Sequence, residues 1–413
     1  MHQPHKPLPS FADLGVPATL TASLSADGIT APFPIQTATL PDSIAGRDVL
    51  GRGRTGSGKT LAFALPMVAR LMASTTSRRP GRPRALVLVP TRELANQVSN
   101  AVTILGAPVG LRTMTVFGGV SQGPQVAAMR RGIDVVVATP GRLEDLMAQR
   151  HVTLDAVEVT VIDEADHMAD LGFLPAVRRI LDRTRAGTQR LLFSATLDGD
   201  VNVLVRRYLD SPVTHSVDGP ESEVPAMAHH VLTVDATHKA AVVRELLSGQ
   251  GRILAFTRTK HAAKKLAGRM TAAGVPSADL HGNLSQNARE RNLAAFHAGD
   301  IRVLVATDIA ARGIHVDDVS LVVHVDPPAE HKAYLHRSGR TARAGAEGVV
   351  VTVATTEQRG DLRGLMRKAK IAPTERPVRP GHPLLAELAG TPLSSLRSSG
   401  SVLRDGRKPR LSR

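Results

Sequence analysis

The sequence predicts an α/β protein with two doubly wound parallel-sheet domains in tandem, for three reasons. The chain has 413 residues, more than one ordinary domain holds, because single domains usually run to about 100–200 residues. Short runs rich in β-branched residues recur along it, as expected for buried parallel strands. Segments with apolar residues at helical spacing separate these runs, and such alternation is typical of doubly wound sheets.

The predicted strands occur in both halves of the chain. They cover residues 135–137, 157–162, 191–193, 253–256, 303–306, 321–325 and 349–353. Two intervening helices are predicted at 260–273 and 287–297, and each ends near a glycine that can terminate it, Gly274 or Gly299.

The charge of the chain favours a polyanionic partner. Its formal net charge is +15, from 52 Lys and Arg against 37 Asp and Glu, although a basic balance can also serve solubility alone. With 8 Phe, 2 Tyr and no Trp, few rings can stack on bases. We therefore expect contacts with a nucleic-acid strand to run through phosphates and sugars.

Other features of the composition exclude classes of protein. The absence of cysteine excludes disulfides, thiolate metal sites and a cysteine nucleophile. No apolar run reaches the roughly 18 residues of a membrane helix, and residues 1–7 lack the layout of a secretion signal. We expect a soluble, cytoplasmic protein without a membrane partner.

Changes in composition mark the domain boundaries. Periodicity lapses around residues 218–225, a polar stretch with Pro and Gly, so we expect a linker at 217–226. The first domain is then predicted at 11–216, after a short tail at 1–10, and the second at 227–373. From Thr374 the chain is rich in Pro, Gly, Ser and Arg, and residues 371–413 hold eight basic and three acidic side chains. This composition predicts a disordered basic tail over 374–413, which either contacts RNA without sequence preference or has no partner.

A phosphate-binding loop is predicted between residues 53 and 60. The segment GRTGSGKT follows the apolar residues 48–50 and leads into the helical pattern of 61–72, which matches that loop in spacing and context. Its glycines allow backbone N–H groups to surround phosphate oxygens at a helix N-terminus. The residues expected at the nucleotide are Arg54, Thr55, Gly56, Ser57, Gly58, Lys59 and Thr60. Lys59 is expected at the β- and γ-phosphates and Thr60 at a magnesium ion, so the loop predicts binding of a nucleoside triphosphate.

Acidic residues follow the predicted strand 157–162 at its carboxyl end, where open α/β sheets bind ligands. Asp163 is expected to hold Mg²⁺, and Glu164 to orient and polarise the water that attacks the γ-phosphate. An acidic tetrapeptide on its own is usually a solvated turn. The preceding strand and the phosphate loop favour the catalytic interpretation here.

A run of three arginines, Arg337, Arg340 and Arg343, occurs in the predicted second domain. Such a run is usually a solvated basic helix face. Phosphoryl transfer, however, needs positive charge that arrives when the site closes. We therefore predict that Arg340 and Arg343 supply this charge across a cleft between the domains.

Taken in order, these segments resemble a DEAD-box ATP-dependent RNA helicase of superfamily 2, over roughly residues 11–371. The resemblance implies two RecA-like domains that close around ATP and RNA, with ATP and Mg²⁺ as cofactors. It implies further nucleotide contacts from Phe11, Gln36, Asp308 and Gly313, of which Gln36 reads the adenine edge. Residues that couple hydrolysis to strand separation would be Asp166, Ser194, Thr196 and His336. Contacts with RNA would come from Pro90, Thr91, Arg92, Gly119, Thr139, Gly141, Arg142, Arg258, Gln286, Arg289 and Thr307.

The chain departs from the family pattern at several positions. Gly53 and Arg54 stand where the family commonly has Ala and Gln, and Ile29 takes a position that is often aromatic. His315 replaces an aspartate that contacts the ribose in relatives. The contact with the nucleotide sugar is therefore one of the points at which this chain departs from the family pattern.

Three other functions are alternatives to an unwinding enzyme. An ATP-gated RNA clamp or scaffold would use the same motifs, and a DNA helicase would share the phosphate machinery. A small-molecule kinase would leave the motifs of the second domain without a role. We expect a monomer that binds RNA and ATP, and the RNA, the pathway and any ribonucleoprotein or RNA-decay partners are left open by the sequence.

Overall fold

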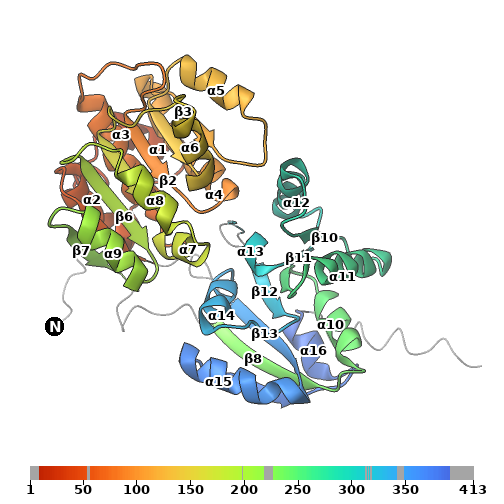
Figure 1. Cartoon of the computed structure of the whole chain (residues 1–413). Helices are drawn as coiled ribbons and strands as arrows, with labels where there is room; N and C mark the ends of the chain where they lie inside the picture. The colour runs from red at the N-terminus through yellow and green to blue at the C-terminus, as the bar shows by residue number, and fades with distance from the viewer. Residues whose placement is uncertain are drawn as a thin grey trace, which may run out of the picture. The chain divides into compact units, whose positions relative to one another are not determined.

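The chain divides into two compact units at the boundary between Glu223 and Val224, here called unit 1 and unit 2 (Figure 1). The computed structural model describes residues 9–390, apart from 54–55, 198, 218–226, 312–313, 315, 317–318 and 342–347. Within this part of the chain, each unit contains a seven-stranded parallel sheet with helices packed on it. The predicted fold class, two doubly wound domains in tandem, is confirmed.

Unit 1 has the strand order β3-β4-β2-β5-β6-β1-β7. Its strands are β1 (Val49–Arg52), β2 (Ala85–Leu88), β3 (Thr113–Val116), β4 (Val135–Ala138), β5 (Val159–Ile162), β6 (Gln189–Ser194) and β7 (Val213–Ser216). Its helices are α1 (Ala18–Ala26), α2 (Pro34–Ile44), α3 (Lys59–Ala73), α4 (Arg92–Gly106), α5 (Gly123–Arg130), α6 (Pro140–Ala148), α7 (Ala165–Asp170), α8 (Leu174–Leu181) and α9 (Gly199–Tyr208), with a short 3₁₀ helix η1 (Ala107–Val109).

Two apolar layers sandwich the sheet of unit 1. In β4, Val135 and Val137 join a core that includes residues of α1–α4, whereas Val136 and Ala138 join a core with residues of α5–α9. Successive side chains of a strand point to opposite faces, so a strand covered on both faces must be apolar throughout. This explains why the central strands are continuous apolar runs in the sequence.

Unit 2 repeats the plan with the order β10-β11-β9-β12-β13-β8-β14. Its strands are β8 (Met227–Val234), β9 (Arg252–Phe256), β10 (Ser277–Leu280), β11 (Val303–Ala306), β12 (Val319–His324), β13 (Gly348–Thr355) and β14 (Thr374–Pro377). Its helices are α10 (Lys239–Leu247), α11 (Lys260–Ala272), α12 (Gln286–Ala298), α13 (Asp308–Ala311), α14 (His331–Ser338), α15 (Arg359–Ala369) and α16 (Pro383–Leu388), with a short 3₁₀ helix η2 (Thr356–Gln358).

Each of the seven strands predicted from β-branched runs is present, as β4, β5, β6, β9, β11, β12 and β13. The unpredicted strands include β3, β7 and β10, whose short mixed sequences TMTV, VTHS and SADL lack such runs. All three are edge strands with a single neighbouring strand, so less of their side-chain surface must be apolar. Among the described residues, no helix combines the length and the apolar character needed to cross a bilayer.

The prediction that a disordered tail begins at residue 374 is wrong in its starting point. Thr374–Pro377 pairs in parallel with β8 as an edge strand, where a proline is tolerated because one side of the strand needs no ladder bond. Leu385 of α16 is 1% exposed and belongs to the core of unit 2. Residues 391–413, most of the predicted linker and residues 1–8 lie outside the described part of the chain.

Candidate nucleotide and nucleic-acid site

The predicted motifs of unit 1 meet at one edge of its sheet. All neighbouring strands run in parallel, so their carboxyl ends share this edge. The phosphate loop follows β1, Pro90 follows β2, Thr139 follows β4 and Asp163 follows β5. Residues that are more than a hundred positions apart in the sequence are thereby brought to a common surface.

The phosphate loop leads into α3 through Gly58, which has a left-handed backbone with φ of 88°. Lys59 is 7% exposed, and its Nζ donates to the carbonyl oxygen of Gly53 at 2.7 Å. A side chain at Gly53 would place its Cβ 2.8 Å from Ser57 Oγ, so the loop is tightly wound. Arg54 and Thr55 lie outside the described residues.

The acidic segment lies at the end of β5. Asp163 is 2% exposed, and its Oδ1 accepts a hydrogen bond from the backbone N–H of Glu164 at 2.9 Å. Burial raises the pKa of Asp163 to about 7, because the loss of water outweighs the attraction of Lys59. Glu164 adopts a left-handed backbone, φ 50° and ψ 51°, and its Oε2 lies 3.0 Å from Nδ1 of His167. A left-handed backbone at a residue other than glycine, next to a buried acid, is typical of a functional site.

Three of the predicted coupling residues are bonded to one another. Asp166 Oδ2 accepts hydrogen bonds from the backbone N–H and the hydroxyl of Thr196, at 2.9 and 3.1 Å. The backbone N–H of Asp166 donates to Ser194 Oγ at 3.2 Å, and that hydroxyl donates to the carbonyl of Thr196 at 2.7 Å. The backbone N–H of Gly53 donates to the Ser194 carbonyl at 3.2 Å, which ties the network to the phosphate loop. The fourth residue, His336, belongs to unit 2.

Gln36 connects the predicted adenine segment to the phosphate loop. Its Oε1 accepts from the backbone N–H of Phe33 at 2.9 Å, and its Nε2 donates to the carbonyl of Gly58 at 2.8 Å. Phe33 is 50% exposed and lies so near the loop that a Cβ at Gly58 would stand 2.6 Å from its Cδ2. Phe11, by contrast, is 4% exposed and packs in the core of unit 1. Phe33 lies within the segment 28–36 that resembles the family's adenine-reading segment, but sequence reasoning did not single it out as a site residue.

The predicted RNA residues of unit 1 converge on the loop after β3. The guanidinium of Arg92 lies against Gly119, where a Cβ would stand 2.2 Å from it. Both terminal nitrogens of Arg142 donate to the carbonyl of Val120 at 3.3 Å. Thr91 caps α4 by accepting a bond from the backbone N–H of Leu94 at 3.3 Å. Three separate motifs thus form one cationic surface at the carboxyl edge.

The corresponding edge of unit 2 carries the predicted residues of the second domain. Arg258 follows β9, Thr307 follows β11, and Gln286 and Arg289 begin α12. Arg289 is 9% exposed and donates from Nη2 to the carbonyl of Ala310 at 3.2 Å. Arg340 is 6% exposed and follows α14. Gly313, His315 and Arg343 lie outside the described residues.

Comparison with known proteins finds a helicase family model for each of the two units. The family model of the DEAD/DEAH box helicases matches residues 33–204, and that of the helicase conserved C-terminal domain matches residues 238–345. DEAD-box ATP-dependent RNA helicase 20 of Arabidopsis thaliana is 35% identical over 377 residues, which cover 89% of this chain and 75% of that protein. The chain belongs to the DEAD-box helicase family.

A further relative and a solved structure are also similar to this DEAD-box chain. The chloroplastic DEAD-box ATP-dependent RNA helicase 3A of Zea mays is 42% identical over 366 residues. These residues cover 87% of this chain but only 49% of that relative. Among solved structures, S. cerevisiae Dbp5 bound to RNA and ADP BeF3 superimposes with a TM-score of 0.78 at 28% identity, covering 89% of this chain and 95% of that one. The chain thus spans about half the length of the Zea mays relative.

An arginine outside the predicted site organises the second domain of the DEAD-box chain. Arg337 is 3% exposed and donates from Nε and Nη2 to the two carboxylate oxygens of Asp308, at 2.5 and 2.7 Å. Asp308, a predicted nucleotide contact, therefore uses both carboxylate oxygens in an ion pair within unit 2. Arg337 lies within α14 whereas Arg340 follows it, so the three-residue spacing alone did not indicate that Arg337 is buried.

The oxygen donors of the DEAD-box motifs suit Mg²⁺. The Thr60 hydroxyl and the Asp163 carboxylate are hard ligands, and Mg²⁺ usually takes one or two carboxylates, waters and substrate phosphates. Within the described residues, Lys59 is the cation whose charge lowers the pKa of the buried Asp163 carboxyl, against the larger effect of burial. Among the described residues, no group of three or more His, Asp or Glu side chains is placed to hold a metal ion.

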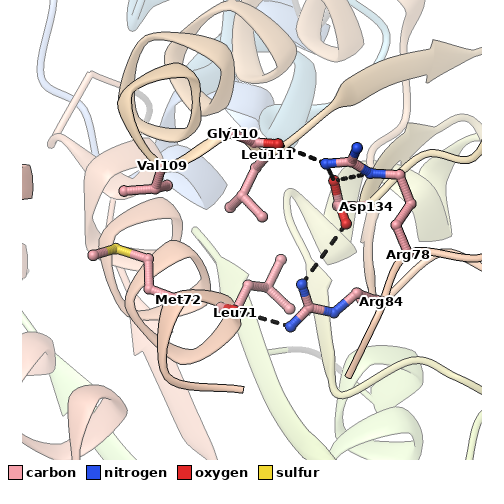
Figure 2. Close-up of a pocket in the computed structure, with 8 residues that line it drawn as sticks. All are labelled: Leu71, Met72, Arg78, Arg84, Val109, Gly110, Leu111 and Asp134. Carbon is pink, nitrogen blue, oxygen red and sulfur yellow. Dashed lines mark hydrogen bonds and ion pairs between the residues drawn. The ribbon is translucent and has the colours of Figure 1, made fainter. Parts of the chain in front are cut away.

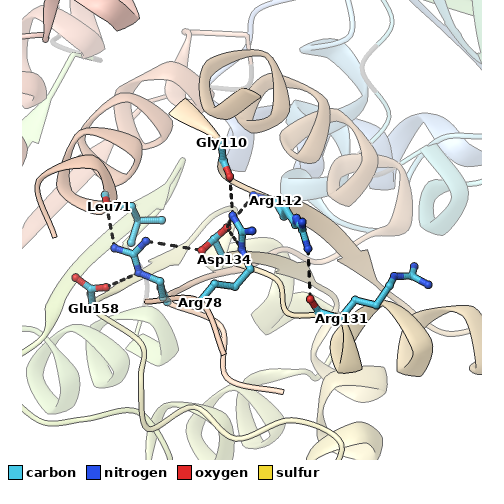
Figure 3. A network of polar contacts seen from close by, with 8 residues as sticks. Leu71, Arg78, Gly110, Arg112, Arg131, Asp134 and Glu158 are labelled. Atoms are coloured by element: carbon cyan, nitrogen blue, oxygen red, sulfur yellow. Dashed lines mark hydrogen bonds and ion pairs between the residues drawn. The ribbon is translucent and has the colours of Figure 1, made fainter. Parts of the chain in front are cut away.

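The opposite edge of the sheet carries an ion-pair network instead of helicase motifs. At the amino ends of β2 and β4, Asp134 lies between Arg78 and Arg84, with Arg78 Nε donating at 2.7 Å (Figures 2 and 3). Arg84 Nε also donates to Glu158 Oε1 at 2.9 Å, and the backbone N–H of Arg112 donates to Asp134 at 2.9 Å. A pocket of about 470 Å³ opens beside the network. Because its arginines are already paired, we interpret this network as structural, joining strand starts far from the nucleotide motifs.

Proposed function

We propose that the chain is an RNA-dependent ATPase that unwinds short RNA duplexes by cycles of closing and opening. The observation that carries this proposal is the network of Asp166, Ser194 and Thr196, which joins the acidic segment to the phosphate loop through Gly53. The names of the relatives, which are RNA helicases, support the same reading.

In the proposed cycle, ATP and one RNA strand favour the same closed arrangement of the two units, and so bind cooperatively. Lys59 contacts the phosphates, and Glu164 orients the attacking water. Arg340 and Arg343 of unit 2 stabilise the charge that develops on the transferred phosphoryl group. Magnesium, when bound through Thr60 and Asp163, neutralises phosphate charge. Closure bends the strand, and release of phosphate reopens the units.

RNA is favoured as the substrate because the helicase motifs are expected to contact phosphates and 2′-hydroxyl groups, not base edges. The solved neighbour Dbp5 of S. cerevisiae, which is bound to RNA, supports this choice. Stimulation of ATP turnover by RNA, but not by DNA of the same sequence, is the expected result. A duplex-separation assay with and without ATP distinguishes unwinding from a clamp that only holds the strand.

The substitution Glu164→Gln tests the assigned chemistry. Glutamine keeps the size of the side chain and can still bond to His167, but it polarises water poorly. We expect ATP and RNA binding to persist while RNA-stimulated turnover falls by about 10²–10⁴-fold, the usual contribution of a general base. A matched control is Glu144→Gln in α6, which removes a surface pair with Arg179 and should leave turnover unchanged. Normal turnover in the Glu164 variant would eliminate this role.

A further inference from the structure

The charged side chains that α11 exposes to solvent are all basic. Its exposed side chains include Lys260, Lys264, Lys265 and Arg269, and the helix contains no aspartate or glutamate. Its inner face is apolar, with Ala263, Ala267 and Met270 buried in the core of unit 2. Along the helix axis the four cations span about 14 Å, at a rise of about 1.5 Å per residue.

Apart from Arg269 in the last turn, where a cation is favoured, this arrangement does not serve the stability of the helix. The first turn of α11 has no acidic residue, although negative charge is favoured there, and Lys260 is its first residue. Without carboxylates the helix also lacks the favourable pairs at spacings of three or four residues. In the described part of the chain none of the four cations forms an ion pair. Their mutual repulsion therefore needs another explanation.

Another helix of unit 2, α15, has basic side chains that pair with an acidic residue. On α15, Arg359 and Arg363 both pair with Glu375 of β14, and Asp361 stands in the first turn. Two of the four basic side chains on that helix, Arg359 and Arg363, are thus balanced by a neighbouring acid. The unbalanced face of α11 is thus a property of this helix and not of all helices in a chain of net charge +15.

The position of α11 indicates which partner would neutralise the positive charge of its exposed face. The helix begins four residues after the carboxyl end of β9, directly beyond Arg258, and packs on β10 and β11 (Figure 1). Arg258, Gln286, Arg289 and Thr307 occupy the same carboxyl edge and are the expected RNA contacts of unit 2. A strand that leaves this edge beside Arg258 meets the N-terminal end of α11 first.

We propose that the face formed by Lys260, Lys264, Lys265 and Arg269 binds the phosphate backbone of RNA that flanks the segment held by the helicase motifs. This inference rests on the proposed function, because it extends the same bound strand. The face has no exposed large apolar side chain, which favours a polyanionic strand over an apolar partner surface. Binding should be independent of sequence and sensitive to salt.

The test compares two single-stranded uridine oligonucleotides, binding to the full chain with a non-hydrolysable ATP analogue. One has about 8 nucleotides, within the range of about 4–16 that a single strand-binding site covers, and the other has about 24. The variant carries Lys264→Gln, Lys265→Gln and Arg269→Gln, since glutamine keeps helix propensity. The control carries Arg367→Gln, Lys368→Gln and Lys370→Gln on and after α15, which removes the same charge from the same unit.

Each lost phosphate contact should reduce the dependence of log Kd on log salt by about 0.7. For three contacts the slope falls by about 2, which at 0.1 M salt is a loss of about 100-fold in affinity for the long oligonucleotide. Affinity for the short one, and ATP turnover stimulated by it, should match the unmodified chain. Circular dichroism checks that α11 stays helical.

The short oligonucleotide reports on the proposed function, and the difference between the two lengths reports on α11. If the unmodified chain binds neither oligonucleotide, both proposals are overturned. If the α15 control loses as much affinity as the α11 variant, the effect is general charge and the surface is refuted. Equal losses for both lengths, or no loss for the long one, also refute it.

Discussion

Removal of either partner of the ion pair between Arg337 and Asp308 should destabilise unit 2 strongly. Arg337 makes two charge-assisted bonds to the carboxylate, donates from Nη1 to the carbonyl of Asp326 at 2.8 Å, and lies over the ring of Phe256 at 5.0 Å from its centroid. These contacts join α14 to the ends of β11, β12 and β9. The exposures of the two side chains differ, at 3% for Arg337 and 33% for Asp308.

The two single substitutions should therefore differ in size. Asp308→Ala leaves a buried guanidinium without a counter-charge, which usually costs about 3–5 kcal/mol in the free energy of unfolding. Arg337→Met leaves a carboxylate that can regain water, so we expect about 2–3 kcal/mol, close to the worth of bonds to a charged group. The double variant should lose less than the sum, with a coupling of about 2 kcal/mol.

Urea unfolding followed by tyrosine fluorescence can measure this cycle. The chain has no Trp and two Tyr, one in each unit, so a Tyr208→Phe background leaves Tyr334 of α14 as the reporter. Tyr334 is fully buried in unit 2, which makes its emission sensitive to unfolding there. A coupling energy below about 0.5 kcal/mol would contradict the interaction described, because unconnected sites add to within that amount.

Two further predictions concern the loop and the pH response. Gly58→Ala forces a Cβ to within 2.6 Å of Gln36 Nε2 at a φ of 88°. A strain of about 1–2 kcal/mol should lower ATP affinity by about 5–30-fold in an ATP titration. Gly268→Ala on the open face of α11 is the control and should leave ATP affinity unchanged. Burial, and then the charge of Arg337, lower the pKa of His324 well below 6.5, so the folded chain keeps it neutral while the unfolded chain takes up a proton. Unit 2 should thus lose stability as pH falls below about 6.5, by about 1.4 kcal/mol at pH 5.5 from this group. His324→Asn, which can still bond to Thr352, should flatten this dependence in urea midpoints measured at pH 7.5 and 5.5, and an unchanged dependence would exclude His324 as its source.

Much of the fold was predictable from local patterns. A strand buried on both faces must be apolar at every position, so the central strands of both sheets are visible in the sequence. The phosphate loop is equally local, because its glycines, Lys59 and Thr60 lie within eight residues. Edge strands such as β14 were not predictable in this way, since their pairing depends on an available neighbouring backbone and not on their own composition.

The sequence by itself determined which chemical groups the chain carries, their order, and the strand ends on which they stand. Only the tertiary structure decided their partners: that Asp166 bonds to Thr196, that Phe11 is core while Phe33 lies exposed at the loop, and that Arg337 takes the carboxylate of Asp308. The physical reason is range. Strand and helix patterns arise from neighbours along the chain, whereas hydrogen bonds and ion pairs need atoms within about 3 Å, and packing alone brings together side chains from distant segments.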